Sequence, residues 1–323
     1  MKILNKISVI VFAIVLSCGV TGLAKAATTT VNLGSAGNFA ILAGTSITDN
    51  PTSAISGNVG LSPAAGSNYA GLTQAEVTGK IYSVNAAGPA GYIQNAALLT
   101  TAKNDLTTAF TDAQGRTPVT TVATELGGQT LSAGVYSSES TTFQVTAGAG
   151  PLVLDGQGDA SSVFIFKMGA EGTGLTVGPG STVSLINSAS ACNVFWEVDT
   201  ASINTTAVFK GNILALNSIT VSRGANIVGR LLARNGNVTL DADIVSAGIC
   251  GAQTATSTPI PTSSSTSTLV TASASSTQTA TPKLPNAGIP PGSNTPRNIV
   301  LFAIVALTSV SLIVVLGKRK LKI

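Results

Sequence analysis

Five tetrapeptides of one pattern recur along the chain: "TSIT" at 45–48, "TGLT" at 173–176, "ASIN" at 201–204, "NSIT" at 217–220 and "GNVT" at 236–239. In each, small polar residues flank an aliphatic residue, and strand alternation sends that residue to one face and its neighbours to the other. The last three aliphatic residues are 16 and 19 positions apart. Such spacing suits one turn of a three-sided β-solenoid, so the pattern predicts stacked coils with an aliphatic interior.

The small polar neighbours would form aligned rows on the outside of the stack, about 4.7–4.9 Å apart from strand to strand. None of their side chains is charged. Together with some of the first residues of the tetrads they make one candidate binding surface. Its residues are Thr45, Ser46, Thr48, Thr173, Thr176, Ser202, Asn204, Asn217, Ser218, Thr220, Asn237 and Thr239.

Residues 27–251 contain many more short alternating segments separated by Gly and Asn, such as "TTFQVTA" and "SSVFIFKM", which predict a mainly β domain. The stretch 91–115 departs from this rhythm. We expect an amphipathic helix over about 91–114 there, ended by Gly115 as its C′ residue. Its apolar stripe must cover one side of the solenoid and so leave another side free. That stripe is Ile93, Ala96, Leu99, Leu106, Phe110 and Ala113.

The composition excludes several classes of function. The chain has no histidine and only 9% charged residues, so it lacks the commonest acid–base group and metal ligand. Residues 27–251 hold eight Lys and Arg against 13 Asp and Glu, a net charge of −5, which disfavours nucleic acid. No GxGxxG or GxxxxGK[ST] motif occurs. We expect no enzyme activity, no cofactor, no metal site and no nucleic-acid partner.

A polysaccharide-cleaving β-helix would need clustered carboxylates. The candidates are Asp155 with Asp159 and Asp241 with Asp243, and we interpret both pairs as solvated acids at turns. Trp196, beside Phe195, would suit stacking on a sugar. Its place in the strand pattern "ACNVFWEV" favours packing in the core instead.

The N-terminal residues 1–26 have the pattern of a secretory signal peptide: cations, an apolar run and the cleavage motif "AKA". Lipoprotein processing at Cys18 is the alternative. After cleavage Cys192 and Cys250 remain, 58 positions apart. We expect them to pair in an exported protein, and closing that loop contributes about 4 kcal/mol in the loop-entropy treatment.

The C-terminal part predicts a tether. Residues 252–296 are rich in Ser, Thr and Pro, which indicates an extended stalk. In the terminal segment 297–323, the apolar run 298–316 spans roughly 28 Å as a helix, enough to cross a membrane, and "KRKLK" follows as a cytoplasmic tail. The motif "LPNAG" at 284–288 is similar to an LPxTG sortase signal, with Ala287 where Thr is usual. Sortase-made wall linkage and a plain membrane anchor both stay open.

Ordered segments across about 30–248 resemble the secreted microbial ice-binding proteins. They include "NLGSAGNFAILAGTSIT", "SGNVGLSPAA", "LGGQTLSAGVYSS", "DGQGDASSVFIFKMG", "FKGNILALNSIT" and "GRLLARNGNVTLDADIV". The resemblance implies a discontinuous right-handed β-helix of triangular cross-section with one long α-helix alongside and a flat face that adsorbs to ice. More active members carry Thr-Ala/Gly-x-Thr/Asn on that face. "TGLT" fits this pattern fully and the other tetrads fit it in part.

We therefore expect a monomer that binds ice, or ordered water, through a flat Thr-, Ser- and Asn-rich face of domain 27–251 and slows ice growth and recrystallisation. The signal peptide and tether predict an exported domain displayed at the cell surface. Its partners there would be the cell envelope and, for wall linkage, a sortase. A surface adhesin that binds a glycan or another solid surface through the same solenoid is the alternative.

Overall fold

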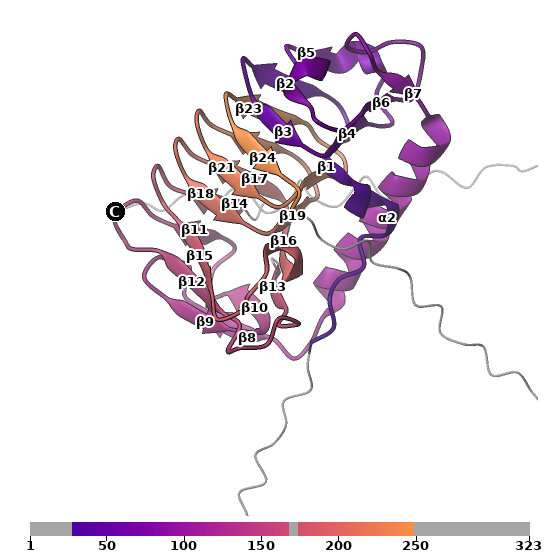
Figure 1. Ribbon diagram of the computed structural model, residues 1–323. Helices are drawn as coiled ribbons and strands as arrows, with labels where there is room; N and C mark the ends of the chain where they lie inside the picture. Colours follow the sequence, from indigo (N-terminus) through magenta and orange to yellow (C-terminus); the bar gives the residue numbers. More distant parts are fainter. Residues whose placement is uncertain (1–27, 168–173, 249–323) are drawn as a thin grey trace, which may run out of the picture. The chain divides into compact units, whose positions relative to one another are not determined.

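The computed structural model describes residues 28–167 and 174–248, which form a stack of coils with one strand on each of three sides (Figure 1). Ahead of the long helix α2 (Ala96–Gly115) come β1 (Phe39–Ala43), β2 (Ile47–Asn50), β3 (Ala54–Ser56), β4 (Asn58–Leu61), β5 (Tyr69–Ala70), β6 (Ile81–Ser83) and β7 (Ile93–Gln94). After it come β8 (Thr120–Val122), β9 (Thr130–Ser132), β10 (Gly134–Ser138), β11 (Phe143–Val145), β12 (Leu152–Asp155), β13 (Phe164–Lys167), β14 (Gly174–Val177), β15 (Val183–Ile186), β16 (Val194–Val198), β17 (Thr200–Ile203), β18 (Val208–Lys210), β19 (Asn212–Ala215), β20 (Ile219–Val221), β21 (Asn226–Val228), β22 (Leu231–Ala233), β23 (Val238–Asp241) and β24 (Ile244–Ser246).

Parallel pairing gives the stack three sides. The helix side is a ten-stranded sheet, β7-β6-β4-β1-β22-β19-β16-β13-β10-β8, and α2 packs against it. The open face is a seven-stranded sheet, β11-β14-β17-β20-β23-β2-β5. The third side consists of β15-β12-β9 and β18-β21-β24-β3, joined by a single bridge between Thr182 and Val208. The predicted solenoid with a helix alongside is confirmed.

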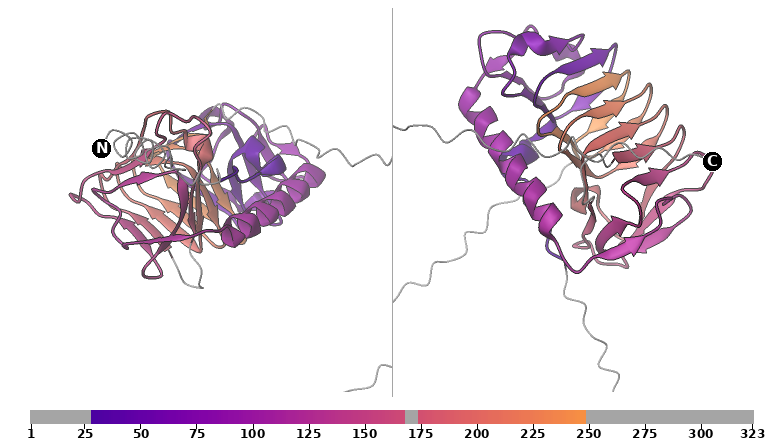
Figure 2. Two further views of the ribbon diagram at one scale, coloured as in Figure 1. Left: turned by 90° about the horizontal axis from the view of Figure 1, so that it is seen from below. Right: turned by 180° about the vertical axis from the view of Figure 1, so that it is seen from behind.

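The chain does not climb the stack in order. Strand β1 lies between β4 and β22, with Ile41 paired to Val59 on one side and to Leu231 on the other. From β1 the coils run to one end of the stack, α2 carries the chain to the other end, and β8 to β24 return to β1 (Figure 2). This order is the discontinuity that the family resemblance implies.

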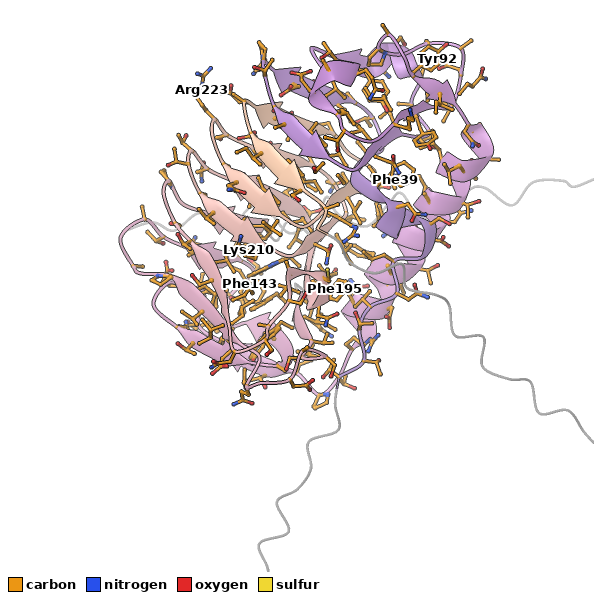
Figure 3. The ribbon with its side chains drawn as sticks, in the orientation of Figure 1. Phe39, Tyr92, Phe143, Phe195, Lys210 and Arg223 are labelled. Atoms are coloured by element: carbon orange, nitrogen blue, oxygen red, sulfur yellow. The ribbon has the colours of Figure 1, made fainter. Side chains whose placement is uncertain are left out.

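Inward-facing side chains of all three sides fill the interior. Trp196 is fully buried and stacks on Phe166, with ring centroids 3.9 Å apart at an interplanar angle of 8°. Phe143 meets the Trp196 ring edge-on. The prediction that Trp196 packs in the core is therefore confirmed. Burial of a large apolar side chain contributes roughly 1.5–3 kcal/mol to the stability of the fold. Phe39 and Phe195 point instead toward α2, where a second apolar cluster forms (Figure 3).

Helix α2 is shorter at its start than predicted. Asn95 is the N-cap, its side chain accepting a hydrogen bond from the backbone N–H of Leu98. Ile93 therefore lies outside the helix and is exposed, and Ala96 is exposed as well. The remaining four residues of the predicted stripe are buried against the helix side, together with Ala102 and Ala109.

Gly115 is the last residue of the helix rather than a left-handed C′ residue, so that prediction is wrong. Arg116 turns the chain to an extended conformation, and Pro118 restricts Thr117 to extended geometry. The helix therefore ends without help from glycine.

The signal peptide, the stalk, the predicted membrane segment and Cys250 lie outside the described residues. Cys192 is disulfide-bonded, and its pairing with Cys250 stays a prediction. None of the helices that the structure describes is long and apolar enough to cross a membrane. The described residues belong to one unit, residues 1–258, with a core of its own.

Candidate functional site

The strands of the open face align their outward hydroxyl groups in one row. The pairings run from Thr176 to Ser202 and Thr220, and then from Thr220 to Thr239 and Thr48. Backbone hydrogen bonds between neighbouring strands fix the repeat at about 4.8 Å. We call this row, with its two end residues, the central row. It comprises Gln144, Thr176, Ser202, Thr220, Thr239, Thr48 and Ala70.

The residues beside the central row point inward and are buried. Leu175, Ile219, Val238 and Ile47 are at most 1% exposed, whereas Thr176 and Thr220 on the outside are exposed. Helix α2 packs on the helix side and not over this row. The predicted alternation of aliphatic interior and polar exterior is therefore confirmed.

The tetrad "ASIN" is out of register with the others, so its predicted alignment is wrong. Ala201, not Ile203, pairs with Leu175 and Ile219, which makes "DTAS" at 199–202 the tetrad of this coil. The shift moves Ser202 from the predicted level of Ser46 and Ser218 into the central row. Asn204 lies in the loop after β17, where its side-chain N–H donates to the Val177 carbonyl at 2.9 Å. A shift of two residues preserves the inward and outward alternation, and for that reason the sequence pattern did not reveal it.

A first row lies two residues before the central row in each coil, at or just before the start of the strand. It comprises Thr142, Gly174, Thr200, Ser218, Asn237, Ser46 and Asn68. Its centre is joined by hydrogen bonds: the Ser218 hydroxyl donates to the Asn237 side-chain oxygen at 2.7 Å, and the Asn237 amide donates to the Thr239 hydroxyl oxygen at 3.0 Å. Asn237 thus positions its neighbours and has both side-chain ends engaged within the protein.

A corner row lies one residue before the first row, ahead of each strand and at the corner with the helix side. It comprises Thr141, Asp199, Asn217, Gly236, Thr45 and Ser67, with Thr173 of the remaining tetrad outside the described residues. Gly236 suits its place because a Cβ atom there would come within 2.6 Å of the Asn217 backbone. Asp199 breaks the uncharged character of this row.

The sequence pattern did not place Thr200 on the open face, nor did it assign the two end strands, β5 and β11, to this face. The centre of the end tetrads is aromatic, Tyr69 in "SNYA" and Phe143 in "TTFQ", rather than aliphatic. The regular spacing of the coils along the sequence is the signal that could have assigned these two tetrads to the open face. Gln144 and Ala70 have no hydroxyl group and lie at the two ends of the central row. The hydroxyl-bearing part of the row therefore spans the five consecutive coils between them.

At the other edge of the open face, the exposed Arg223 forms an ion pair with the half-buried Asp241 at 3.4 Å. Arg223 extends away from the stack (Figure 3). Asp155 and Asp159 accept hydrogen bonds within turns, from Gln157 and Ser161 respectively, as expected of turn acids. In the described part of the chain no group of three or more acidic or cysteine residues is placed to hold a metal ion.

Asp243 is not the solvated turn acid that the sequence predicts, because it is 1% exposed. Its two oxygens accept hydrogen bonds from the backbone N–H groups of Ala225 and Asp241 at 2.9 and 2.8 Å. Burial raises the pKa of Asp243 to about 6, and the nearby carboxyls of Asp241 and Asp49 add to the rise. The Asp243 carboxyl thus stabilises the corner between the open face and the third side through these two hydrogen bonds.

Comparison with known proteins gives a consistent result. The model of the Ice-binding-like family matches residues 41–246. An ice-binding protein of Flavobacterium frigoris (strain PS1) is 39% identical over 220 residues, which cover 67% of this chain and 76% of that protein. An ice-binding protein of Nostoc sp. (strain HG1) is 36% identical over 245 residues, covering 75% and 83%.

Solved structures agree in fold. The crystal structure of an ice-binding protein from an Antarctic biological consortium matches with a TM-score of 0.61 at 35% identity, covering 71% of this chain and 96% of that one. An ice-binding protein from Arctic yeast, solved to explain its antifreeze activity, matches with a TM-score of 0.60 at 30% identity, covering 69% and 96%. Such matches agree with the expectation that the chain is not an enzyme. With this stack of coils, its helix and the matched length, the chain belongs to the Ice-binding-like family.

Proposed function

We propose that the protein binds ice through the open face and thereby slows ice growth and recrystallisation. The observation that supports this most directly is the central row, with small hydroxyl side chains on five consecutive coils in unbroken register. The relatives named above are ice-binding proteins, which supports the same activity here.

An ice surface presents only water molecules on a lattice, so a protein that binds it must be flat, rigid and repetitive. The backbone of the stacked strands fixes the spacing before binding, which keeps the entropic cost of adsorption low. Threonine adds to this rigidity because its χ1 angle is restricted in a strand. Its methyl group favours ordered water over the face, and its hydroxyl group bonds that water.

The test is thermal hysteresis and ice recrystallisation inhibition with residues 27–251, the unit that contains the described core. We expect shaped ice crystals and slowed recrystallisation at concentrations where an inert protein of equal size has no effect. Ice growth that matches this inert control would remove the proposal.

We propose in addition that the domain is displayed at the cell surface with its open face uncovered. Gly248, the last described residue, follows β24 at the corner between the third side and the helix side, where Ala247 packs beside Ala40 and Gly57. This corner is opposite the open face in the order of the three sides. A stalk that begins there would leave the domain at the one corner that does not border the open face.

Display is tested by labelling intact cells with an antibody to the domain, before and after removal of residues 284–323. Loss of surface label and release of the domain into the medium are expected. Equal surface label on cells of both kinds would show that the C-terminal segment is not the anchor.

The alternative, an adhesin for a glycan or another solid, uses the same face. The described open face offers no exposed aromatic ring for stacking on sugar, because Phe143 is buried and Tyr69 is half-buried. Ice adsorption is therefore favoured. Binding to a glycan array in the absence of ice activity would reverse this preference.

A further inference from the structure

We infer that Asp199 limits the activity of the open face, by breaking the corner row at the centre of the stack. The inference rests on the proposed function. Among the described residues of the three rows, Asp199 is the one with a charged side chain, and it lies on the coil between Thr176 and Thr220.

Asp199 also affects the neighbouring coil. Its side-chain oxygen accepts a hydrogen bond from the Asn217 amide at 2.5 Å, and its backbone carbonyl accepts one from the Asn217 backbone N–H at 2.8 Å. The exposed Asn217 side chain is therefore held along the corner. The corner row therefore carries a charge on one coil, and on the next coil an amide N–H of Asn217 is already engaged by that charge.

A carboxylate orients water around its own charge, and that arrangement competes with the lattice that the hydroxyl rows would template. No cation among the described residues forms an ion pair with Asp199, so its charge is not neutralised by a salt bridge. The charge of Asp199 thus acts at the border of the coils on which the central row carries Thr176, Ser202 and Thr220.

The chain offers a matched control. On the third side, the Asp155 side chain accepts a hydrogen bond from the amide of Asn187 on the next coil at 2.9 Å. Asp155 and Asp199 therefore make the same kind of contact between coils, but only Asp199 borders the open face. Replacing either Asp by Asn changes the net charge equally.

The experiment compares thermal hysteresis at equal concentration for the wild type, Asp199→Asn, Asp199→Thr and Asp155→Asn, all as residues 27–251. We expect both Asp199 variants to gain about twofold or more, with Thr at least equal to Asn because it restores the hydroxyl of the row. Asp155→Asn should match the wild type. Melting temperatures within a few degrees of one another would confirm that all four proteins are folded.

Several outcomes would overturn the inference. Unchanged or lower activity in Asp199→Asn, beside an active wild type, would show that the carboxylate does not limit the face. An equal gain in Asp155→Asn would assign the effect to net charge. An inactive wild type would instead contradict the proposed function, so the two failures are distinguishable.

Discussion

The open face and the third side are built from the same coils, yet their surfaces differ. Both consist of short parallel strands with the same backbone repeat. On the open face, one row keeps a hydroxyl group through five consecutive coils. On the third side, an equivalent row mixes hydroxyl, aliphatic and charged residues: Thr130, Val153, Ser184, Lys210, Val228, Ser246, Ser56 and Thr78.

The third side is also less continuous. Its sheet is interrupted between β15 and β18, Lys210 lies on it (Figure 3), and near β3 it is hollowed by a cavity of about 450 Å³ beside Ser56, Glu76 and Ile244. The solenoid backbone therefore supplies the same strand spacing to every side. Only the choice of side chains makes one side a uniform template.

The largest expected effect comes from a bulky residue placed on the open face. Thr220→Tyr places a ring above the central row and holds the flanking coils away from ice. We expect it to lose at least about tenfold in ice affinity, or about 1.4 kcal/mol, with little change in melting temperature. Thermal hysteresis and ice-affinity partitioning measure it.

The control is Asn226→Tyr, at an exposed position of β21 on the third side of the same coil. It should keep the wild-type activity. A loss in both variants would mean that both sides contact ice, and a large fall in the melting temperature of Thr220→Tyr would mean that Thr220 is packed.

A second effect concerns the corner that joins the two sides. Asp243 has a folded-state pKa of about 6, above the value of about 3.9 expected in the unfolded chain. The folded state therefore binds this proton more tightly. Protonation of Asp243 adds at most about 3 kcal/mol to the free energy of unfolding. This contribution is fully present below about pH 4 and is lost as the pH rises through about 6.

Thermal unfolding of the wild type and Asp243→Asn between about pH 4.5 and pH 7 isolates this group. The difference in melting temperature between the two pH values should be smaller in the variant than in the wild type. The groups that face Asp243 are Asp49, whose pKa burial raises, and Asp241, which pairs with Arg223. Glu76, beside Asp49, has a lowered pKa because Thr73 donates to it against the effect of burial. Parallel pH curves for both proteins would show that Asp243 is not responsible.

The smallest effect tests how the open face is held in order. Asn237→Ala removes the hydrogen bonds that position Ser218 and Thr239. We expect a loss of activity of about threefold, which corresponds to one hydrogen bond of about 0.6 kcal/mol. Asn226→Ala on the third side is the matched control and should leave activity unchanged. A variant as active as the wild type would indicate that the backbone alone keeps these side chains ordered.

Much of the fold and of the open face could be predicted from the sequence, because a solenoid depends on local sequence patterns. Alternation placed Ile47, Leu175, Ile219 and Val238 inside and their neighbours outside. It could not fix the register of β17, since a shift of two residues leaves the alternation intact. Ala201 is also too small to signal an interior position.

The burial of Asp243 could not be predicted either. It depends on contacts made by residues distant in sequence: the Asp243 backbone N–H donates to the Ser53 hydroxyl at 3.0 Å, across 190 positions. Short-range patterns indicate turns well, but they do not show which turn another part of the chain covers.

The placement of β1 between β4 and β22 has a consequence for biosynthesis. During synthesis the strands from β1 to β7 are made first, while the coil β22 to β24, which pairs with β1, β2 and β3, is made last. Until then the nascent domain carries an unpaired strand edge, which can associate with another chain. A truncated product without the final coil would therefore lose β23 from the middle of the open face, between β20 and β2. Its unpaired strand edges would favour self-association.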